Sequence, residues 1–183
     1  MKRAVIVHGW GGNPQAGWIP WLKKELEAKN IFVEAPQMPH TDTPTIEDWV
    51  PQLAKYVDAE DESYLIGHSM GCQTIMRYLE KLPAGVKIKG VVLVAGFITL
   101  RGLNPEEQVI AQPWLDTPLN IEKVRANADK FVSVFSDDDP FVSEDNWEVL
   151  RKLGEVVVLH GKQHIEEPFE KSVLEAALKL LKN

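Results

Sequence analysis

Six short apolar segments recur along the chain, and a stretch with helical spacing separates most of them from the next. The apolar segments are residues 4–7, 31–34, 64–66, 91–94, 131–135 and 156–159. They are nearly continuous runs of Val, Ile and Leu, which is typical of strands that helices cover on both faces. The pattern therefore predicts an α/β fold with one doubly wound, mostly parallel sheet of about six strands.

The intervals between the strands carry helical periodicity, most clearly over residues 18–29, 46–57, 70–82, 144–153 and 169–181. Thr43 and Pro44 fit an N-cap and a first helical residue. Ser143 is expected to cap the helix over residues 144–153, and Gly154 to end it. Residues 96–120 contain three prolines and are expected to be the least regular part of the chain.

Composition limits the classes of protein to consider. A length of 183 residues fits one domain with a sizeable core, and 44% hydrophobic against 26% charged residues is typical of a globular chain. A formal net charge of −7 argues against nucleic-acid and anionic-membrane partners. The apolar run before His8 is too short for a signal peptide or a membrane span, so a cytoplasmic protein is expected. Cys72, the single cysteine, excludes an internal disulfide and is interpreted as a small core residue.

The Gly-His-Ser-Met-Gly motif at residues 67–71 carries the strongest chemical signal. Alone, its Gly-X-Ser-X-Gly pattern arises by chance in about one of twenty chains of this size. Here it follows a predicted strand and opens a predicted helix, the setting that a serine nucleophile requires. The flanking glycines leave room for a tight, strained turn, so Ser69 is predicted to be the nucleophile. The backbone N–H of Met70, at the start of the helix, is predicted to bind the developing oxyanion.

A glycine-rich loop at residues 8–13 follows the first predicted strand. Its spacing matches neither Gly-X-Gly-X-X-Gly nor a P-loop pattern, which argues against a phosphate site. In hydrolases with the motif described above, an early loop supplies the second oxyanion donor, and the backbone N–H of Trp10 is expected to fill this role. The alternative is a flexible connection in which Trp10 plugs the core. His8 is interpreted as a structural hydrogen-bonding residue beneath the loop.

The acid of such a site follows the serine in sequence and the histidine follows the acid. Three aspartates, Asp137, Asp138 and Asp139, come directly after the predicted strand 131–135. Asp139, directly before Pro140, is the preferred acid, because a carboxylate just past a strand end can orient an imidazole. Asp137 or Asp138 could take its place, and the whole cluster could instead be an acidic loop that caps the next helix.

Two histidines follow the acid in sequence. His160 directly follows the predicted strand 156–159, whereas His164 lies four residues further on, in the loop before the last helix. The base must reach over the strand ends to Ser69, so His164 is predicted to be the general base and His160 a polar residue at the end of a strand.

Six tryptophans raise the question of a binding pocket. Trp10, Trp18 and Trp114 fall in segments near the predicted carboxyl edge of the sheet and are candidates to line a substrate pocket. The other three lie in helical patterns and are expected to pack in the core. No His, Asp or Glu cluster has metal-ligand spacing beyond the triad candidates, so no metal and no cofactor are expected.

These features together resemble the small serine hydrolases that include retinoblastoma-binding protein nine and the YdeN-like proteins. The resemblance covers nearly the whole chain and rests on segments 4–7, 21–26, 38–39, 66–69, 76–78, 91–94, 138–141 and 161–164. It implies a single-domain α/β-hydrolase over residues 1–183, with little or no cap and a Ser69–Asp139–His164 triad. Three positions depart from the family pattern: Met70 stands where Ser or Leu is frequent, Gln112 where some members have Arg, and Gln163 where a glycine is usual.

The expected reaction is hydrolysis of a small ester, or of a thioester or activated amide, through an acyl-enzyme. The expected partner is a small acyl substrate; a protein partner is implied only by the resemblance. The alternative is a catalytically weak or inactive protein-binding module with the same fold. A dehalogenase is disfavoured because its motif would need an aspartate where Ser69 stands.

Overall fold

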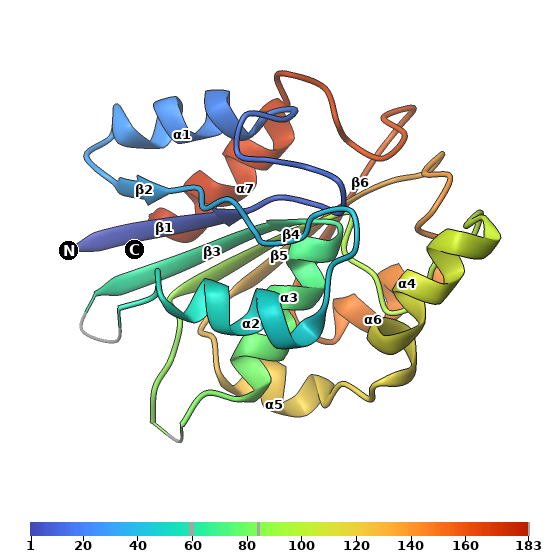
Figure 1. The fold of residues 1–183 in the computed structure, drawn as a ribbon. Coiled ribbons are helices and arrows are strands. Elements are labelled where there is room, and N and C mark those ends of the chain that lie inside the picture. Colours follow the sequence, from blue (N-terminus) through green and yellow to red (C-terminus); the bar gives the residue numbers. More distant parts are fainter. Residues whose placement is uncertain (59–60, 84, 183) are drawn as a thin grey trace.

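The computed structural model describes residues 1–58, 61–83 and 85–182 and contains one six-stranded sheet (Figure 1). The strand order is β2-β1-β3-β4-β5-β6, and every neighbouring pair is parallel, so the predicted α/β architecture is confirmed. The strands are β1 (Lys2–Val7), β2 (Phe32–Glu34), β3 (Glu62–His68), β4 (Gly90–Val94), β5 (Phe131–Ser136) and β6 (Glu155–Leu159).

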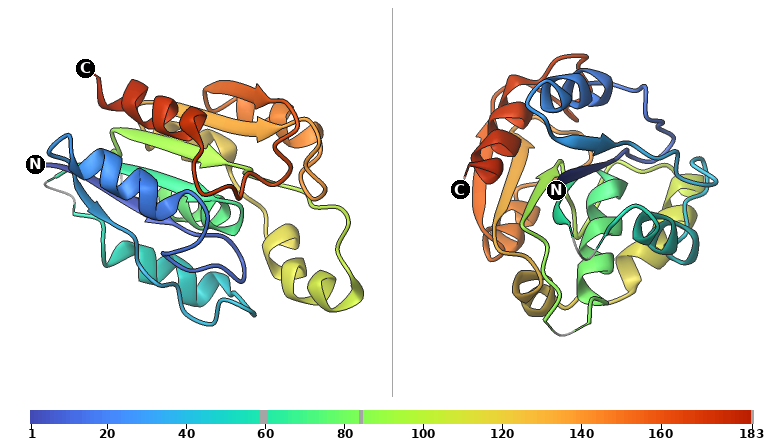
Figure 2. Two further views of the ribbon diagram at one scale, coloured as in Figure 1. Left: turned by 90° about the horizontal axis from the view of Figure 1, so that it is seen from above. Right: turned by 90° about the vertical axis from the view of Figure 1, so that its left-hand side faces the viewer.

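Helices cover both faces of the sheet (Figures 1 and 2). One face carries α1 (Ile19–Glu27) and α7 (Lys171–Leu181). The other carries α2 (Ile46–Ala54), α3 (Met70–Glu80), α4 (Pro105–Asp116), α5 (Ile121–Ala126) and α6 (Asp145–Arg151). In the described part of the chain no helix is both long enough and apolar enough to cross a membrane.

Burial on both faces explains the continuous apolar runs. Successive side chains of a strand point to opposite faces, and β1 illustrates the consequence. Val5 and Val7 enter the core beneath α2 and α3, whereas Ala4 and Ile6 enter the core beneath α1 and α7. All four are at most 1% exposed. A strand of this kind has no solvent-facing positions to make polar, so its sequence does not alternate.

Two predicted helix starts are wrong. Thr45, not Thr43, caps α2, because its side chain accepts a hydrogen bond from the Asp48 N–H (3.2 Å). Glu144 occupies the N-cap position of α6, where Ser143 was expected. Both shifts are one or two residues, the usual uncertainty of a helix boundary read from sequence.

The segment expected to be least regular contains α4. Asn104 and Glu107 form a capping box, in which the Asn104 side chain accepts from the Glu106 and Glu107 N–H groups and Glu107 accepts from the Asn104 N–H. Pro105 fits the first turn because no intrahelical partner exists there for an N–H. The prolines of this segment are therefore compatible with the helix: one lies in its first turn, and another is accommodated within it.

The parallel topology brings the predicted site residues to one edge. All six strands end at the same side, and the loops after β1, β3, β5 and β6 gather there, while both termini lie at the opposite side (Figures 1 and 2). Crevices at the carboxyl edge of such a sheet are where ligands bind in open α/β folds.

Asn146 fixes the loop that follows β4. Its buried side chain accepts hydrogen bonds from the Ile98 N–H (2.6 Å) and the Thr99 N–H (3.0 Å). It also donates to the carbonyl oxygens of Thr99 (3.1 Å) and Ser143 (3.2 Å). One side chain on α6 thereby satisfies four backbone groups and ties the loop after β4 to α6.

Replacing this amide should destabilise the fold. Asn146→Ala leaves buried N–H and C=O groups without partners, and we expect the free energy of unfolding to fall by about 2–4 kcal/mol in urea titrations. The exposed neighbour gives the matched control, Asp145→Ala, which should change it by about 0.5 kcal/mol or less. Equal effects of the two substitutions would contradict the role given to the Asn146 network.

Candidate active site

Ser69 lies on the turn between β3 and α3, in a strained backbone conformation. Its φ is 51° and its ψ −114°, a region that non-glycine residues rarely occupy. The Ser69 N–H donates to the carbonyl oxygen of Val94, at the end of β4 (2.9 Å). The side chain makes no capping hydrogen bond to α3, although it stands at the N-cap position. The hydroxyl is therefore not engaged by the helix that it precedes.

The two glycines of the motif are required by close backbone contacts. A Cβ at Gly67 would lie 2.8 Å from the backbone nitrogen of Cys72, and a Cβ at Gly71 would collide with the carbonyl oxygen of Val7. The contact at Gly71 brings the start of α3 against the end of β1. The strained turn and the loop after β1 therefore lie side by side.

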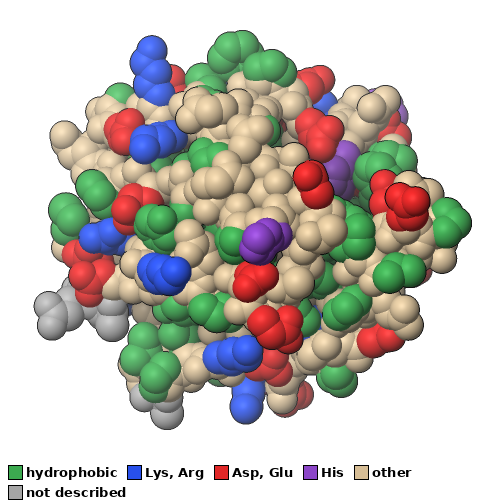
Figure 3. Space-filling view, viewed as in Figure 1, with side chains coloured by type: hydrophobic (Ala, Val, Ile, Leu, Met, Phe, Trp, Pro, Cys, Tyr) green, Lys and Arg blue, Asp and Glu red, His purple; other side chains and the backbone are tan. Residues whose placement is uncertain are grey.

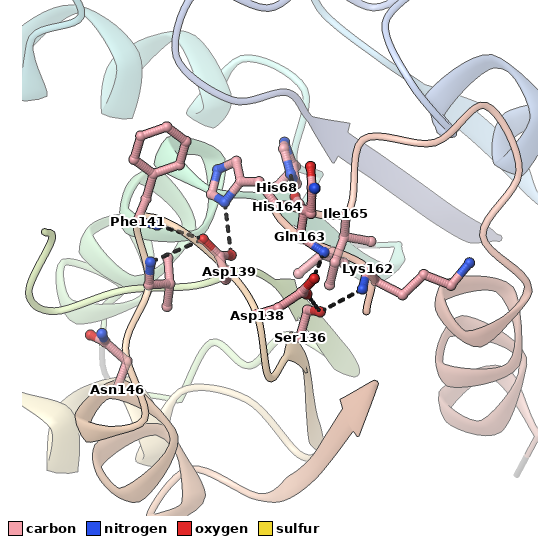
Figure 4. Close-up of polar contacts among 12 residues, drawn as sticks. His68, Ser136, Asp138, Asp139, Phe141, Asn146, Lys162, Gln163, His164 and Ile165 are labelled. Carbon is pink, nitrogen blue, oxygen red and sulfur yellow. Dashed lines mark hydrogen bonds and ion pairs between the residues drawn. The ribbon is translucent and has the colours of Figure 1, made fainter. Parts of the chain in front are cut away.

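His164 and Asp139 form a hydrogen-bonded pair. His164 Nδ1 lies 2.9 Å from Asp139 Oδ2, and the other carboxylate oxygen accepts from the N–H groups of Phe141 (2.8 Å) and Val142 (3.0 Å) (Figure 4). Asp139 is 2% exposed. A carboxylate that accepts this many hydrogen bonds is held in one orientation. Because the carboxylate accepts, Nδ1 of His164 carries the proton and Nε2 is left as an acceptor.

The neighbouring aspartates have other partners. Asp137 binds the exposed His160 (2.5 Å), and this hydrogen bond lowers the pKa of the Asp137 carboxyl and raises the pKa of His160. Asp138 accepts from the Ser136 hydroxyl (2.7 Å) and from the Gln163 N–H (2.7 Å). Of the three aspartates, Asp139 alone contacts His164 in the described hydrogen bonds. The structure therefore distinguishes between three aspartates that the sequence left as alternatives.

Ser69 and His164 line the same cavity, at the carboxyl edge of the sheet. Among the residues that the structure describes, their side chains form no hydrogen bond with one another. In enzymes without substrate such contacts are often long or poorly aligned and tighten when the substrate binds.

The backbone N–H groups of Trp10 and Met70 have no acceptor within the described part of the chain. Met70 is the first residue of α3, where an N–H has no intrahelical partner. The Trp10 N–H belongs to the same peptide unit as the Gly9 carbonyl, so the two point in opposite directions. The Gly9 oxygen is held by His8 Nδ1 (2.8 Å) and by the Gly12 N–H (3.1 Å), which fixes the direction of the Trp10 N–H.

His8 can act only as a neutral group in this arrangement. Its Nε2 accepts from the Met38 N–H (3.1 Å), so Nδ1 must be the nitrogen that donates to the Gly9 oxygen. Burial lowers the pKa of His8, which favours the same neutral form. The structural interpretation of this residue agrees with these contacts.

The sequence gives no direct signal for a role of His68, and the structure assigns it one. Its Nε2 donates to the carbonyl oxygen of His164 (2.8 Å), while Trp18 Nε1 donates to that of Ile165 (2.9 Å). These two buried side chains hold a loop in which Gln163 (φ 46°) and Ile165 (φ 57°) adopt left-handed conformations. Such residues cost of order 1–3 kcal/mol each and persist where the surroundings hold them.

Two adjoining cavities meet at the glycine-rich loop. One, of about 280 Å³, holds Ser69 and His164 together with Leu100, Leu103 and Phe141. The other, of about 320 Å³, is lined by Trp10 and Trp18 among others. Gly9, Trp10, Gly11, His68 and Glu166 border both.

Trp114, predicted to lie near a pocket, lines neither of these two cavities. It is 1% exposed, and its indole nitrogen donates to the carbonyl oxygen of Pro44 (2.9 Å). Its ring packs edge-on against Trp49 (6.2 Å between ring centroids). Trp114 therefore lies in the core and not in the predicted pocket.

Three side chains of types that bind metal ions come together at the cavity of Ser69. One ring nitrogen each of His68 and His164 and a carboxylate oxygen of Glu166 lie within 4.8 Å of one another. Nε2 of His68 and Nδ1 of His164 already have partners, so each imidazole has one nitrogen left for a ligand.

Comparison with known proteins places this chain in a family. The family described as serine hydrolase matches residues 4–183. The chain belongs to this family. It is 32% identical over 143 residues to the serine hydrolase RBBP9 of Rattus norvegicus, a match that spans 76% of this chain and 73% of that protein. It is 37% identical over 97 residues to YdeN of Bacillus subtilis (strain 168), which is 52% of this chain and only 51% of that protein.

Solved structures of α/β hydrolases share the fold of this serine hydrolase. The crystal structure of the ydeN gene product from B. subtilis superposes with a TM-score of 0.89 at 24% identity, over 100% of both chains. Est1E from Butyrivibrio proteoclasticus has a TM-score of 0.74 at 17% identity, over 100% of this chain and 89% of the other. At these identities the likeness concerns the fold alone.

Burial of His68 should make stability depend on pH. Burial lowers the pKa of His68 to about 3, below its ordinary value of 6.5, so between these values the unfolded chain binds a proton that the folded chain does not. The contribution of His68 to the free energy of unfolding is complete above pH 6.5. It falls by up to about 1.4 kcal/mol per pH unit as the pH drops towards 3. We expect His68→Gln to flatten the pH dependence of unfolding free energy between pH 7 and about 4.

His160 supplies a control of opposite sign. Its hydrogen bond to Asp137 raises its pKa, so its contribution is present at low pH and is lost as the pH rises through the folded value. His160→Gln should therefore make the free energy of unfolding rise slightly more steeply with pH, the opposite of the effect expected for His68→Gln. Parallel curves for wild type and His68→Gln would refute the assignment of His68 as a buried neutral group.

Proposed function

We propose that this serine hydrolase cleaves small carboxylic esters by acyl transfer, with Ser69 as nucleophile, His164 as general base and Asp139 as the residue that orients the base. The observation that supports this best is the 2.9 Å contact between His164 and the buried Asp139, at the edge of the cavity that holds Ser69. A non-catalytic binding protein has no need for this pair beside a strained serine.

In the first step the Ser69 hydroxyl oxygen attacks the ester carbonyl carbon, and its proton passes to Nε2 of His164. The resulting oxyanion accepts hydrogen bonds from the N–H groups of Trp10 and Met70. When the intermediate collapses, the imidazolium gives the proton to the departing alcohol. Asp139, which stays ionised, stabilises the imidazolium between these transfers.

In the second step a water molecule attacks the acyl-enzyme. His164 removes a proton from that water, the same two N–H groups bind the second oxyanion, and the Ser69 oxygen leaves with the proton from His164. All the proton transfers use one histidine, and no step requires a metal ion or an organic cofactor.

Small substrates fit the two cavities best. Volumes of about 280 and 320 Å³ lie at the lower end of the range for ligand pockets. One cavity would take the acyl group and the other the leaving group, because the glycine-rich loop beside Ser69 borders both. Thioesters and activated amides meet the same chemical requirements. A crystal structure of Est1E, similar in fold, has ferulic acid bound.

A fluorophosphonate probe tests the nucleophile. We expect stoichiometric labelling of wild-type protein on Ser69, and complete loss of labelling in Ser69→Ala, because only an activated serine attacks the phosphorus. Cys72→Ala should label normally, since burial raises the pKa of that thiol well above its ordinary value. Intact-mass and peptide-mass measurements locate the adduct. Folded wild-type protein that stays unlabelled would favour a binding module instead.

Asp139 and Asp137 offer a matched pair of substitutions. Asp139→Asn removes the acceptor that fixes the His164 tautomer, and we expect kcat for a p-nitrophenyl ester to fall by about 10³–10⁴ with a small change in KM. Asp137→Asn alters a carboxylate that contacts His160 at the surface, and kcat should stay within about threefold of wild type. Similar losses in both variants would remove Asp139 from the proposed mechanism.

A further inference from the structure

The cavity that holds Ser69 carries negative charge. Its lining includes two carboxylates, Glu107 and Glu166, and no lysine or arginine from the part of the chain that the structure describes. In the space-filling view, histidine and acidic side chains lie together on the side where the strands end, with hydrophobic side chains beside them (Figure 3). The lysine and arginine side chains in that view lie mainly on the left and lower parts of the molecule.

Glu166 lies close to the reacting groups. One of its carboxylate oxygens is within 4.8 Å of a ring nitrogen of His164. Its side chain is exposed and, among the described contacts, makes no ion pair or hydrogen bond. Two nearby cations have other partners: Lys162 pairs with Glu167 (2.7 Å) and Glu170 (3.4 Å), and Arg101 donates to the carbonyl oxygen of Asp139 (2.7 Å). Glu166 therefore presents an unneutralised charge to both cavities.

Glu107, on α4, adds a second charge to the same cavity. Its Oε2 accepts from the Asn104 N–H (2.8 Å), in the capping box of α4, and Oε1 has no partner in the described network. Leu100, Leu103 and Phe141 line the same cavity. Among the described residues, the lysine, arginine, aspartate and glutamate side chains that line this cavity are thus all acidic, and apolar side chains lie beside them.

A site with this lining discriminates between substrates by charge. Two carboxylates on a narrow cavity attract cations and repel anions, and the net charge of −7 acts in the same direction. The apolar side chains favour a hydrocarbon group next to the charge. A substrate that carries a phosphate or a free carboxylate would meet no compensating cation in this cavity.

We propose that the preferred acyl substrates of this site carry a cationic amino group on an apolar chain, with the ammonium attracted by Glu166 and Glu107. This inference rests on the proposed esterase function and adds a substrate class to it. Glu166 and Glu107 are specificity-determining residues in this proposal, while Ser69 and His164 perform the bond-breaking steps.

Three p-nitrophenyl esters of closely matched length test the proposal. Their acyl chains end in ammonium (ω-aminohexanoate), methyl (heptanoate) and carboxylate (monopimelate). We expect kcat/KM for the ammonium ester to exceed that for the methyl ester by about tenfold at low ionic strength, and the carboxylate ester to be the poorest. Added NaCl should bring the three values together, because salt screens charges in an open cleft.

Charge-neutral variants locate the effect. Glu166→Gln and Glu107→Gln should each lower the ammonium-to-methyl ratio several-fold, and the double variant should bring it close to one. Glutamine at residue 107 keeps the capping box, so the helix start is preserved while the charge is lost. The neighbours Glu167 and Glu106, which do not line the cavity, give the matched controls Glu167→Gln and Glu106→Gln, for which the ratio should be unchanged.

The possible results separate this proposal from the proposed function. If the methyl ester is hydrolysed and Ser69 is labelled, but the ammonium-to-methyl ratio is near one or is the same in all four single variants, the substrate class is wrong and the esterase mechanism stands. If folded wild-type protein hydrolyses none of the three esters and takes up no fluorophosphonate, the proposed function itself fails.

Discussion

The close approach of Gly71 to the end of β1 constrains the rest of the site. With no Cβ at that position, the start of α3 packs directly on the carbonyl oxygens of Val7 and His8. This contact sets the Met70 N–H beside the loop that carries the Trp10 N–H, and it leaves Ser69 on a turn with positive φ. A larger residue in place of Gly71 would push α3 away from the sheet and separate the two N–H groups. The geometry of the site therefore requires glycine at this position.

A second constraint acts on the loop that contains Gln163, His164 and Ile165. Three hydrogen bonds from separate parts of the chain hold it: Asp138 accepts from the Gln163 N–H, His68 donates to the His164 carbonyl, and Trp18 donates to the Ile165 carbonyl. The strain of the left-handed residues is opposed by these contacts and by the buried rings around them. Since His68 lies next to Ser69 in sequence, one of the three bonds links the turn of Ser69 directly to the loop of His164.

Much of this arrangement could be predicted from the sequence, and the reason is periodicity. Residues buried on both faces must be apolar, so the six strands stand out, and the parallel topology then places every strand end at one edge. The order of serine, aspartate and histidine along the chain selected Ser69, Asp139 and His164 as candidates, and the structure brings Asp139 and His164 together. The close choice between Asp137, Asp138 and Asp139 required coordinates, because it depends on hydrogen-bond partners some 25 residues away.

Other features had no reliable signal in the sequence. The His68 contact joins residues 96 positions apart and follows no motif spacing. Trp114 could be placed near the pocket or in the core until its indole partner, Pro44, was known. For α4 the signal was present, because Asn104 and Glu107 have capping-box spacing, but the surrounding prolines obscured it.

In the proposed mechanism Ser69, the Trp10 and Met70 N–H groups, and His164 converge on one reacting carbonyl. A crystal structure of the protein after reaction with a fluorophosphonate tests it most directly, since the tetrahedral phosphorus resembles the intermediate. We predict a bond from phosphorus to the Ser69 oxygen and a phosphonyl oxygen about 2.7–3.1 Å from both backbone nitrogens. An adduct on another residue, or a phosphonyl oxygen directed away from both N–H groups, would contradict the account.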